Sequence, residues 1–354
     1  MRILILPAAL LLLVPHAHAD VKIKEETQKR IDKALEWLSS KQNTDGSFSE
    51  GPYQHNTAIT AFAMLAFMSQ GHLPNQGLYG PEVAKAGRFL IASAQKVEIA
   101  GASPEEKEGA YLIGARGGNM YAHAMATLAL AELWGQTMDE DLRPVLKKAV
   151  NLIVNTQQRD RVDRDGKPMG GWRYEPRPTG ADISVTIMQV MALRSARNGG
   201  IKVPDATFDK AIRYIKSCYH GGGFTYQSGS GAPGFARTAA GCCVLFLSGK
   251  YDKKDIAKDY GIDIEKAVDY MKKTSDSPIH FYYGHYYAAH AMHQVGGKDW
   301  DDWYDKMERF FGGQQQADGS WSRTTRSEVG PVYQTSIATI ILSVPAGYLP
   351  IFQR

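Results

Sequence analysis

The chain has 354 residues, 44% hydrophobic and 22% charged, with a formal net charge of +4. This length suffices for one large domain or two smaller ones. A charge so near neutral gives no indication of a nucleic-acid surface, and no Lys/Arg run is interleaved with aromatic residues.

The first residues have the pattern of a secretory leader. Arg2 is followed by an apolar run over residues 3–14 and by Ala17-His18-Ala19, a small-x-small cleavage site. The run is too short to span a bilayer. We therefore expect a signal peptide at residues 1–19, cleavage near Ala19, and export of the mature chain to the periplasm or the exterior, with no transmembrane segment.

Helical periodicity then predicts pairs of helices along the rest of the chain. The first helix of each pair is amphipathic and is expected at about 24–42, 81–97, 140–158, 205–218, 262–274 and 300–315. The second is rich in Ala, Thr and Met, and is expected from Asn56 and at about 119–134, 181–197, 235–248, 283–295 and 332–344.

A short motif recurs between the helices of a pair: Gln at a helix end, a Gly-containing turn, and an aromatic residue that we call the plug. The clearest copies run from Gln42 to Phe48 and from Gln315 to Trp321. Weaker copies pair Gln157 with Trp172 and contain Phe224, and the motif has decayed near Tyr111 and Phe281. A period of about 50 residues with two helices per unit indicates a repeat architecture.

Amphipathic helices should face water, and helices that are apolar all round should be buried. This pattern predicts an all-α fold, an α/α toroid of six helix hairpins forming one domain over residues 20–354. An open solenoid is the alternative. The terminal repeats of solenoids are polar caps, whereas here the last inner helix is as apolar as the others, so closure is favoured.

The Gln-to-Trp stretch 314–321 resembles the repeat of squalene–hopene and oxidosqualene cyclases, which recurs in looser form in protein prenyltransferase β-subunits. The resemblance covers residues 24–345 and implies the toroid fold. It also implies that the Gln and its plug fasten neighbouring helix pairs. Unrelated functions share this scaffold.

The chemistry of that family is not evident in the chain. Its cyclases use an Asp-x-Asp-Asp acid, whereas the nearest position here holds Asp182 alone. Its prenyltransferases bind zinc with an Asp-x-Cys pair that does not occur. Cys218, Cys242 and Cys243 lack the spacing of a zinc site, and buried free thiols are favoured over one disulfide. We expect no metal and no cofactor, and no catalytic residue is assigned.

Polar residues cluster near the starts of the inner helices, which a closed toroid would gather at one end of a central cavity. Helix N-termini there would favour an anionic or hydroxyl-rich ligand. Arg237 stands out because a charge at a buried helix start needs a partner, such as Asp182. The candidates for the cavity rim are His55, Asn119, His123, Asp182, Arg237, Tyr283, His285, Tyr286, Tyr333 and Gln334. Capping or core packing is the structural alternative for most of them.

The sequence thus predicts an exported toroid that binds a ligand, either apolar and isoprenoid-like or a glycan, or a protein partner through its central cavity. The cavity would be lined by Met64, Met125, Met188, Met191 and Met292. The alternatives are a polysaccharide lyase that uses Arg237 as its base, and residual terpenoid cyclase or transferase activity. A deep apolar cavity would favour lipid, an open polar groove polysaccharide, and a filled centre only partners on the outer surface.

Overall fold

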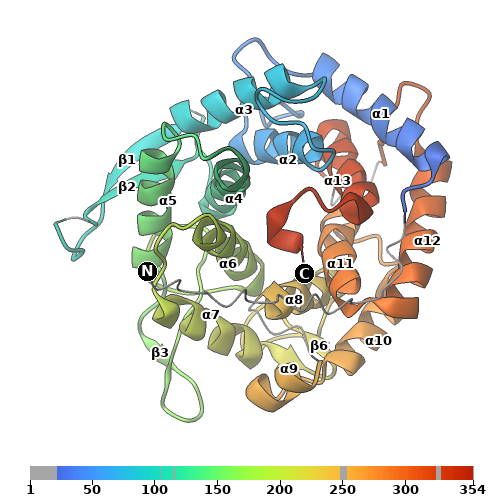
Figure 1. The fold of residues 1–354 in the computed structure, drawn as a ribbon. Helices are drawn as coiled ribbons and strands as arrows, with labels where there is room; N and C mark the ends of the chain where they lie inside the picture. The colour runs from blue at the N-terminus through green and yellow to red at the C-terminus, as the bar shows by residue number, and fades with distance from the viewer. Residues whose placement is uncertain (1–21, 105, 115, 248–252, 324–327, 354) are drawn as a thin grey trace, which may run out of the picture.

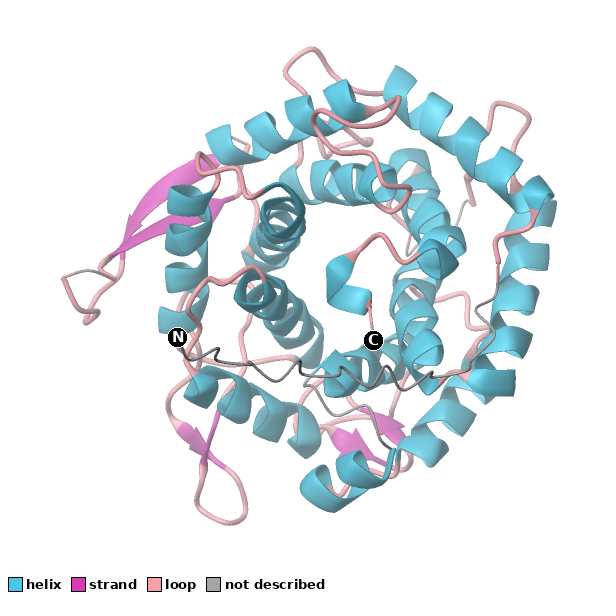
Figure 2. Cartoon of the chain, in the orientation of Figure 1, coloured by secondary structure: helices cyan, strands magenta, loops and turns pink. Residues whose placement is uncertain are grey.

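The computed structural model describes residues 22–104, 106–114, 116–247, 253–323 and 328–353; the expected leader lies outside these ranges. Within them the helices form two concentric rings, and the predicted α/α toroid is confirmed (Figure 1 and Figure 2). The inner helices are α2 (Thr57–Met68), α4 (Met120–Thr137), α6 (Ile183–Asn198), α8 (Phe235–Leu247), α11 (Phe281–Val295) and α13 (Pro331–Ser343).

The outer ring surrounds the inner helices, and the chain alternates between outer and inner helices. Its helices are α1 (Glu25–Ser40), α3 (Gly80–Ala92), α5 (Arg143–Asn155), α7 (Asp205–Ser217), α10 (Ile264–Thr274) and α12 (Gly297–Gln314), with a short α9 (Lys253–Tyr260) before α10. Each inner helix packs on the next, and α13 packs on α2. The ring is therefore closed, as the sequence favoured over an open solenoid.

Composition explains why these helices take inner or outer positions. In α2 every residue except Ala58 is buried. The outer helix α7 buries one side and exposes Asp209 and Lys216 on the other. Burying an apolar side chain such as Phe62 contributes about 1.5–3 kcal/mol, so an all-apolar helix is stable only inside the ring.

Glutamines fasten neighbouring pairs in the way that the repeat implies. Gln157 donates from Nε2 to the carbonyl of Gly170 in its own turn and to that of Thr207 in the next outer helix, both at 2.9 Å. The same two bonds are made by Gln42, to Gly46 and Glu82, and by Gln315, to Gly319 and Arg30. Gln315 thereby ties the last repeat to the first.

The plugs are held by a second recurrent contact, from the inner helix. The hydroxyl of Thr186 accepts a 3.0 Å hydrogen bond from the backbone N–H of Trp172. Equivalent bonds join Phe48 to Thr60, Phe224 to Thr238 and Trp321 to Thr335. This position on each inner helix, which we call the plug-facing position, therefore points outward, toward the turn and the outer ring.

One outer segment differs from the prediction. The helix expected over residues 81–97 ends at Ala92, and the chain continues as β1 (Ala94–Glu98), which pairs antiparallel with β2 (Glu108–Leu112). The buried residues of β2 pack on α5, which compensates for the shorter helix. Two further antiparallel pairs are two residues long per strand: β3 (Arg161–Val162) with β4 (Pro168–Met169), and β5 (Tyr219–His220) with β6 (Gly223–Phe224).

The end of the chain turns into the ring. After α13 come two short 3₁₀ helices, η1 (Val344–Ala346) and η2 (Pro350–Phe352), and Figure 1 shows this segment inside the inner ring. Leu349, Ile351 and Phe352 are buried there, and Gln294 of α11 donates to the carbonyl of Phe352 at 2.9 Å. We call residues 344–353 the C-terminal segment; it closes the end of the ring at which the inner helices finish.

Candidate functional site at the ring axis

The middle of the ring is filled with side chains. Successive residues of a helix are ~100° apart, so the residue two places after each plug-facing position points toward the axis. These residues are Phe62, Met125, Met188, Ala240, Tyr287 and Ile337, and none is more than 1% exposed.

Contacts across the axis confirm the filling. The Tyr287 hydroxyl of α11 reaches the sulfur of Met188 in α6, and the rings of Phe62 in α2 and Tyr286 in α11 lie 5.6 Å apart. Neither pair of helices is adjacent in the ring. The methionines that were expected to line a cavity are packed as well: Met64, Met125, Met188, Met191 and Met292 are at most 1% exposed. Among the described residues the expected cavity is therefore filled, which leaves the surfaces of the toroid, including the ends of its axis, for a ligand or partner.

At the end where the inner helices begin, side chains near the axis are partly exposed instead. The residues two places before each plug-facing position form a layer that we call the axial mouth: Ala58, Tyr121, Ser184, Ala236, Tyr283 and Tyr333. Four of them, Ala58, Tyr121, Ser184 and Tyr283, are partly exposed above the closed layer. The ring centroids of Tyr121 and Tyr283 are 6.0 Å apart across the axis.

The hydroxyls at the mouth are protonated at neutral pH. Burial raises the pKa of Tyr283 to about 12 and that of Tyr121 well above its usual value. The hydroxyls of Tyr121, Ser184 and Tyr287 surround that of Tyr283, which makes no hydrogen bond of regular geometry with them. These hydroxyl groups are therefore uncharged, and that of Tyr283 is enclosed by its neighbours.

Three of the inner helices have N-terminal N–H groups that already have partners at the mouth. The N–H groups of Met120 and Ile183 donate to the carbonyls of Tyr174 and Tyr226, at 2.8 and 3.0 Å, from loops of the following repeats. Val332 of α13 donates to a Glu50 carboxylate oxygen at 2.6 Å. These amide groups are thus not available to an anion, contrary to the expectation that the helix starts would favour one.

Asp182 acts as a helix cap. Its Oδ1 accepts from the backbone N–H of Val185 at 2.9 Å, and the residue is 0% exposed. Burial raises its pKa, a shift opposed by the Val185 hydrogen bond and the charge of Arg173. The Tyr226 hydroxyl lies near this carboxyl group, and Oδ2 has no hydrogen-bond partner of regular geometry among the described residues. Closed off from solvent, the carboxyl group cannot reach a substrate in this conformation.

Arg237 does not pair with Asp182 as expected. Its guanidinium folds back over the preceding loop and donates to the carbonyl of Ala232 at 3.0 Å. Three further candidates also hold local structure. Asn119 caps α4, Gln334 pairs with the backbone of Arg323 at 2.6 and 3.1 Å, and His55 contacts Asp45 and Ser47.

His123 and His285 occupy the plug-facing position and point away from the axis. Nδ1 of His123 accepts from the N–H of Leu112 at 3.1 Å, so Leu112 takes the place of the missing second plug. Nε2 of His285 lies 3.0 Å from the carbonyl of Ser275. Burial lowers the pKa of both imidazoles to about 3. Tyr283, Tyr286 and Tyr333 are the candidates that do lie toward the axis.

The remaining chemistry of the described residues is sparse. Cys218, Cys242 and Cys243 are buried and free, and burial raises the pKa of each thiol. The described parts of the chain hold no cluster of three or more His, Cys, Asp or Glu suited to a metal ion. Within the same parts, no helix is both long and apolar enough to span a bilayer.

A closed double ring of inner and outer helices defines a toroid-fold protein. More specifically, the chain belongs to the prenyltransferase alpha-alpha toroid domain family, whose model matches residues 7–159 and 114–277. The resemblance inferred from the Gln-to-Trp repeat is thereby confirmed. No protein of curated function matches the chain.

Solved structures of several activities share the fold. A cellobiose 2-epimerase from Bacillus thermoamylovorans superposes with a TM-score of 0.62 at 11% identity, covering 91% of this chain and 99% of that one. An α-1,6-mannanase variant of Salegentibacter sp., in complex with α-1,6-mannotriose, gives 0.59 at 8%, covering 91% and 99%. The type II terpene cyclase MstE from Scytonema gives 0.55 at 13%, covering 94% and 100%. At such identities these similarities establish the fold alone.

Proposed function

We propose that this protein is an exported glycan-binding toroid that holds a neutral oligosaccharide against the axial mouth. The observation that carries the proposal is the pair Tyr121 and Tyr283, partly exposed and 6.0 Å apart above a closed layer. Aromatic rings pack against the apolar faces of sugars while hydroxyl groups supply hydrogen bonds. Ser184 adds a second hydroxyl beside that of Tyr121, whereas the Tyr283 hydroxyl is enclosed and this residue offers its ring.

Two features favour a neutral glycan over the other ligand classes. The covered N–H groups of α4, α6 and α13 leave little to bind an anion. The closed layer below the mouth, in which Phe62, Met188 and Tyr287 are fully buried, leaves no deep apolar channel for an isoprenoid chain. Export, expected from residues 1–19, would place the protein among extracellular or periplasmic saccharides.

The fold neighbours are compatible with this proposal. One of them holds α-1,6-mannotriose, and another is named for an action on cellobiose. A terpenoid ligand is the competing class, since MstE has been solved with merosterolic acid A. The residues considered for the two alternative activities do not support them. Arg237, the base of the polysaccharide lyase alternative, contacts its own loop, and Asp182, at the position of the cyclase acid, is buried as a helix cap.

Binding of α-1,6-mannotriose, cellobiose and a wider panel of neutral oligosaccharides should be measured by isothermal titration calorimetry. Tyr121→Ala and Tyr283→Ala are each expected to weaken binding about 10-fold. Tyr348→Ala is the matched control, since Tyr348 is 48% exposed at the opposite end of the ring. The proposal fails if no oligosaccharide binds saturably, or if both mouth variants bind as tightly as the wild type.

A further inference from the structure

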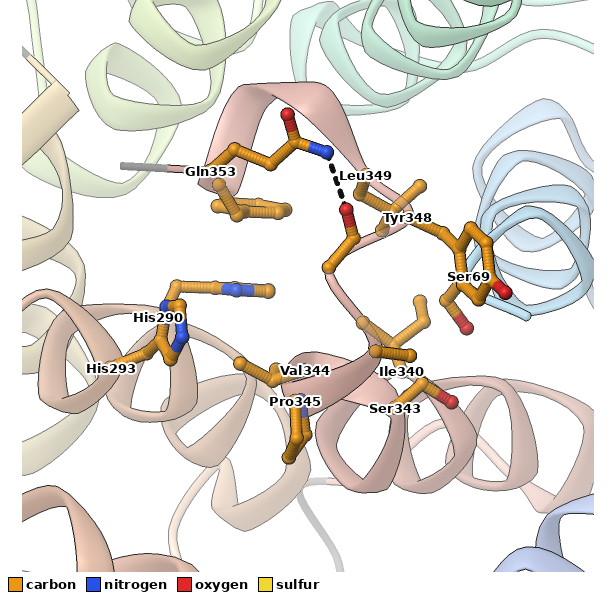
Figure 3. Close-up of a pocket in the computed structure, with 13 residues that line it drawn as sticks. Ser69, His290, His293, Ile340, Ser343, Val344, Pro345, Tyr348, Leu349 and Gln353 are labelled. Carbon is orange, nitrogen blue, oxygen red and sulfur yellow. Dashed lines mark hydrogen bonds between the residues drawn. The ribbon is translucent and has the colours of Figure 1, made fainter. Parts of the chain in front are cut away.

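The end of the ring opposite to the axial mouth contains a cavity of about 300 Å³. The C-terminal segment forms one wall, and the ends of α2, α11 and α13 form the others, as Figure 3 shows. The residues that line it include Ser69, His290, His293, Ile340, Ser343, Tyr348, Leu349 and Phe352. This volume is at the lower end of the range for small-molecule sites.

His290 projects from α11 into this cavity (Figure 3). Its ring stacks on that of Phe352, with 3.3 Å between centroids and 5° between planes, and the residue is only 2% exposed. Neither ring nitrogen has a hydrogen-bond partner among the residues that the structure describes. A buried polar group without a partner costs free energy unless a bound molecule satisfies it.

The two serine hydroxyls of the cavity wall are already engaged. The Ser69 hydroxyl donates to the Ala66 carbonyl at 2.7 Å. The Ser343 hydroxyl donates to the Thr339 carbonyl at 2.7 Å and accepts from Gln70 at 2.7 Å. Of these three side chains, His290 is the one whose polar atoms lack a partner among the described residues.

The chemistry of the wall limits what that ligand can be. None of the described residues that line the cavity carries a carboxylate, an ammonium or a guanidinium. Burial lowers the pKa of His290 well below its usual value, so the imidazole is neutral and offers one donor and one acceptor. Ile340, Val344 and Leu349 supply apolar surface.

We infer that this cavity is a second binding site, for a small uncharged molecule with an apolar body and a hydroxyl group that pairs with His290. Occupancy is linked to the docking of the C-terminal segment. That segment contributes Phe352 to the site and is fastened by two bonds, from Gln294 to the Phe352 carbonyl at 2.9 Å and from the Ile351 N–H to Glu132 at 3.3 Å. The site does not depend on the glycan site, which lies at the other end of the axis.

Phenol and toluene provide the test, because they have similar size and differ in the hydroxyl group. Protein with ¹⁵N-labelled histidine should show a saturable shift of the His290 ring nitrogens on titration with phenol. Phenol is expected to bind about 3- to 10-fold more tightly than toluene. His290→Phe keeps an aromatic ring against Phe352 and should abolish this preference.

Tyr53→Phe, which changes an exposed tyrosine outside the cavity, is the control and should retain the preference for phenol. Equal affinities for phenol and toluene, or a preference that survives in His290→Phe, would overturn the inference. So would the absence of a saturable shift at His290, which would make the cavity a packing defect. The ¹⁵N shifts of the wild type decide the question even if His290→Phe does not fold.

Discussion

Gln315, which directly follows the last outer helix, donates a 2.9 Å hydrogen bond to the carbonyl of Arg30 in the first outer helix. Its second bond holds Gly319 in its own turn. The same side chain therefore shapes a turn and closes the ring. Thr27 supports this closure by donating to Glu308 at 2.6 Å.

Gln315→Ala is expected to lower the free energy of unfolding by about 1–3 kcal/mol, because it leaves two carbonyl groups without their donor. Urea denaturation measures the loss. Gln314→Ala changes the neighbouring exposed glutamine and should alter stability by less than about 0.5 kcal/mol. Equal effects of the two substitutions would contradict the role of Gln315 in closure.

The turn glycine of the first repeat should be intolerant of substitution. Gly46 has a φ of +87°, and a Cβ atom there would lie 2.3 Å from the carbonyl oxygen of Lys85. Gly46→Ala is expected to cost more than about 2 kcal/mol. Gly51 also has a positive φ, of +48°, but a Cβ atom there meets nothing within 4 Å. Gly51→Ala should cost about 1 kcal/mol, and thermal or urea unfolding that ranks the two the other way would refute the steric argument.

His123 is expected to be structural. His123→Phe leaves the buried Leu112 N–H without an acceptor and should cost about 1–3 kcal/mol, with glycan affinity unchanged. Thr186→Val removes the acceptor of the Trp172 N–H and should give a loss of the same order. Unfolding experiments and calorimetric titrations measure the two properties separately. A His123→Phe variant that is stable but has lost glycan binding would show that His123 belongs to the site.

Glu132 should make stability depend on pH. Burial raises its pKa from 4.5 to about 7, opposed by hydrogen bonds from Ser195 and the Ile351 N–H. As the pH rises, the unfolded chain releases this proton first, so the folded state loses stability between pH 4.5 and about 7. The loss is on the order of 3 kcal/mol. Burial raises the pKa of the neighbouring Tyr286 well above its usual value, with a smaller contribution from Glu132, so Tyr286 stays neutral over this range.

Glu132→Gln should remove this dependence. Relative to the wild type, the variant is expected to gain about 3 kcal/mol between pH 4 and pH 8, as measured by denaturation at several pH values. Glu106→Gln, at an exposed position, is the control and should show no such gain. If the wild type and Glu132→Gln run parallel across the range, the carboxyl group titrates normally.

Much of the fold was predictable because alternation between amphipathic and apolar segments directly reflects burial. The inner helix expected at 181–197, for example, spans Ile183–Asn198. The exception is the β1–β2 hairpin, where residues 94–97 were predicted to be helical. Its pairing depends on contacts between Ala94 and Leu112 and between Glu98 and Glu108. Such distant pairing leaves no trace in local periodicity.

The site was harder to predict, because side chains two positions apart on a helix point to nearly opposite sides of it. Tyr121 and His123 both lie near the start of α4, yet one faces the axis and the other faces the Leu112 N–H. The Thr that follows each plug in the next inner helix, as Thr186 follows Trp172, indicates which side of that helix faces outward. The insertion of the C-terminal segment, with Phe352 on His290, depends on where the chain goes after α13 and had no local signal.

Closure has a consequence for how the chain acquires its structure. Thr27 and Glu308 are hydrogen-bonded although 281 positions separate them in the sequence, and so are Val332 and Glu50, which are 282 positions apart. Contacts this distant are slow to form, because the entropy of the intervening chain is lost before they stabilise anything. During synthesis the first repeat must therefore persist with one flank uncovered until the sixth emerges. Export before folding would postpone the joining of the two ends until the whole chain has crossed.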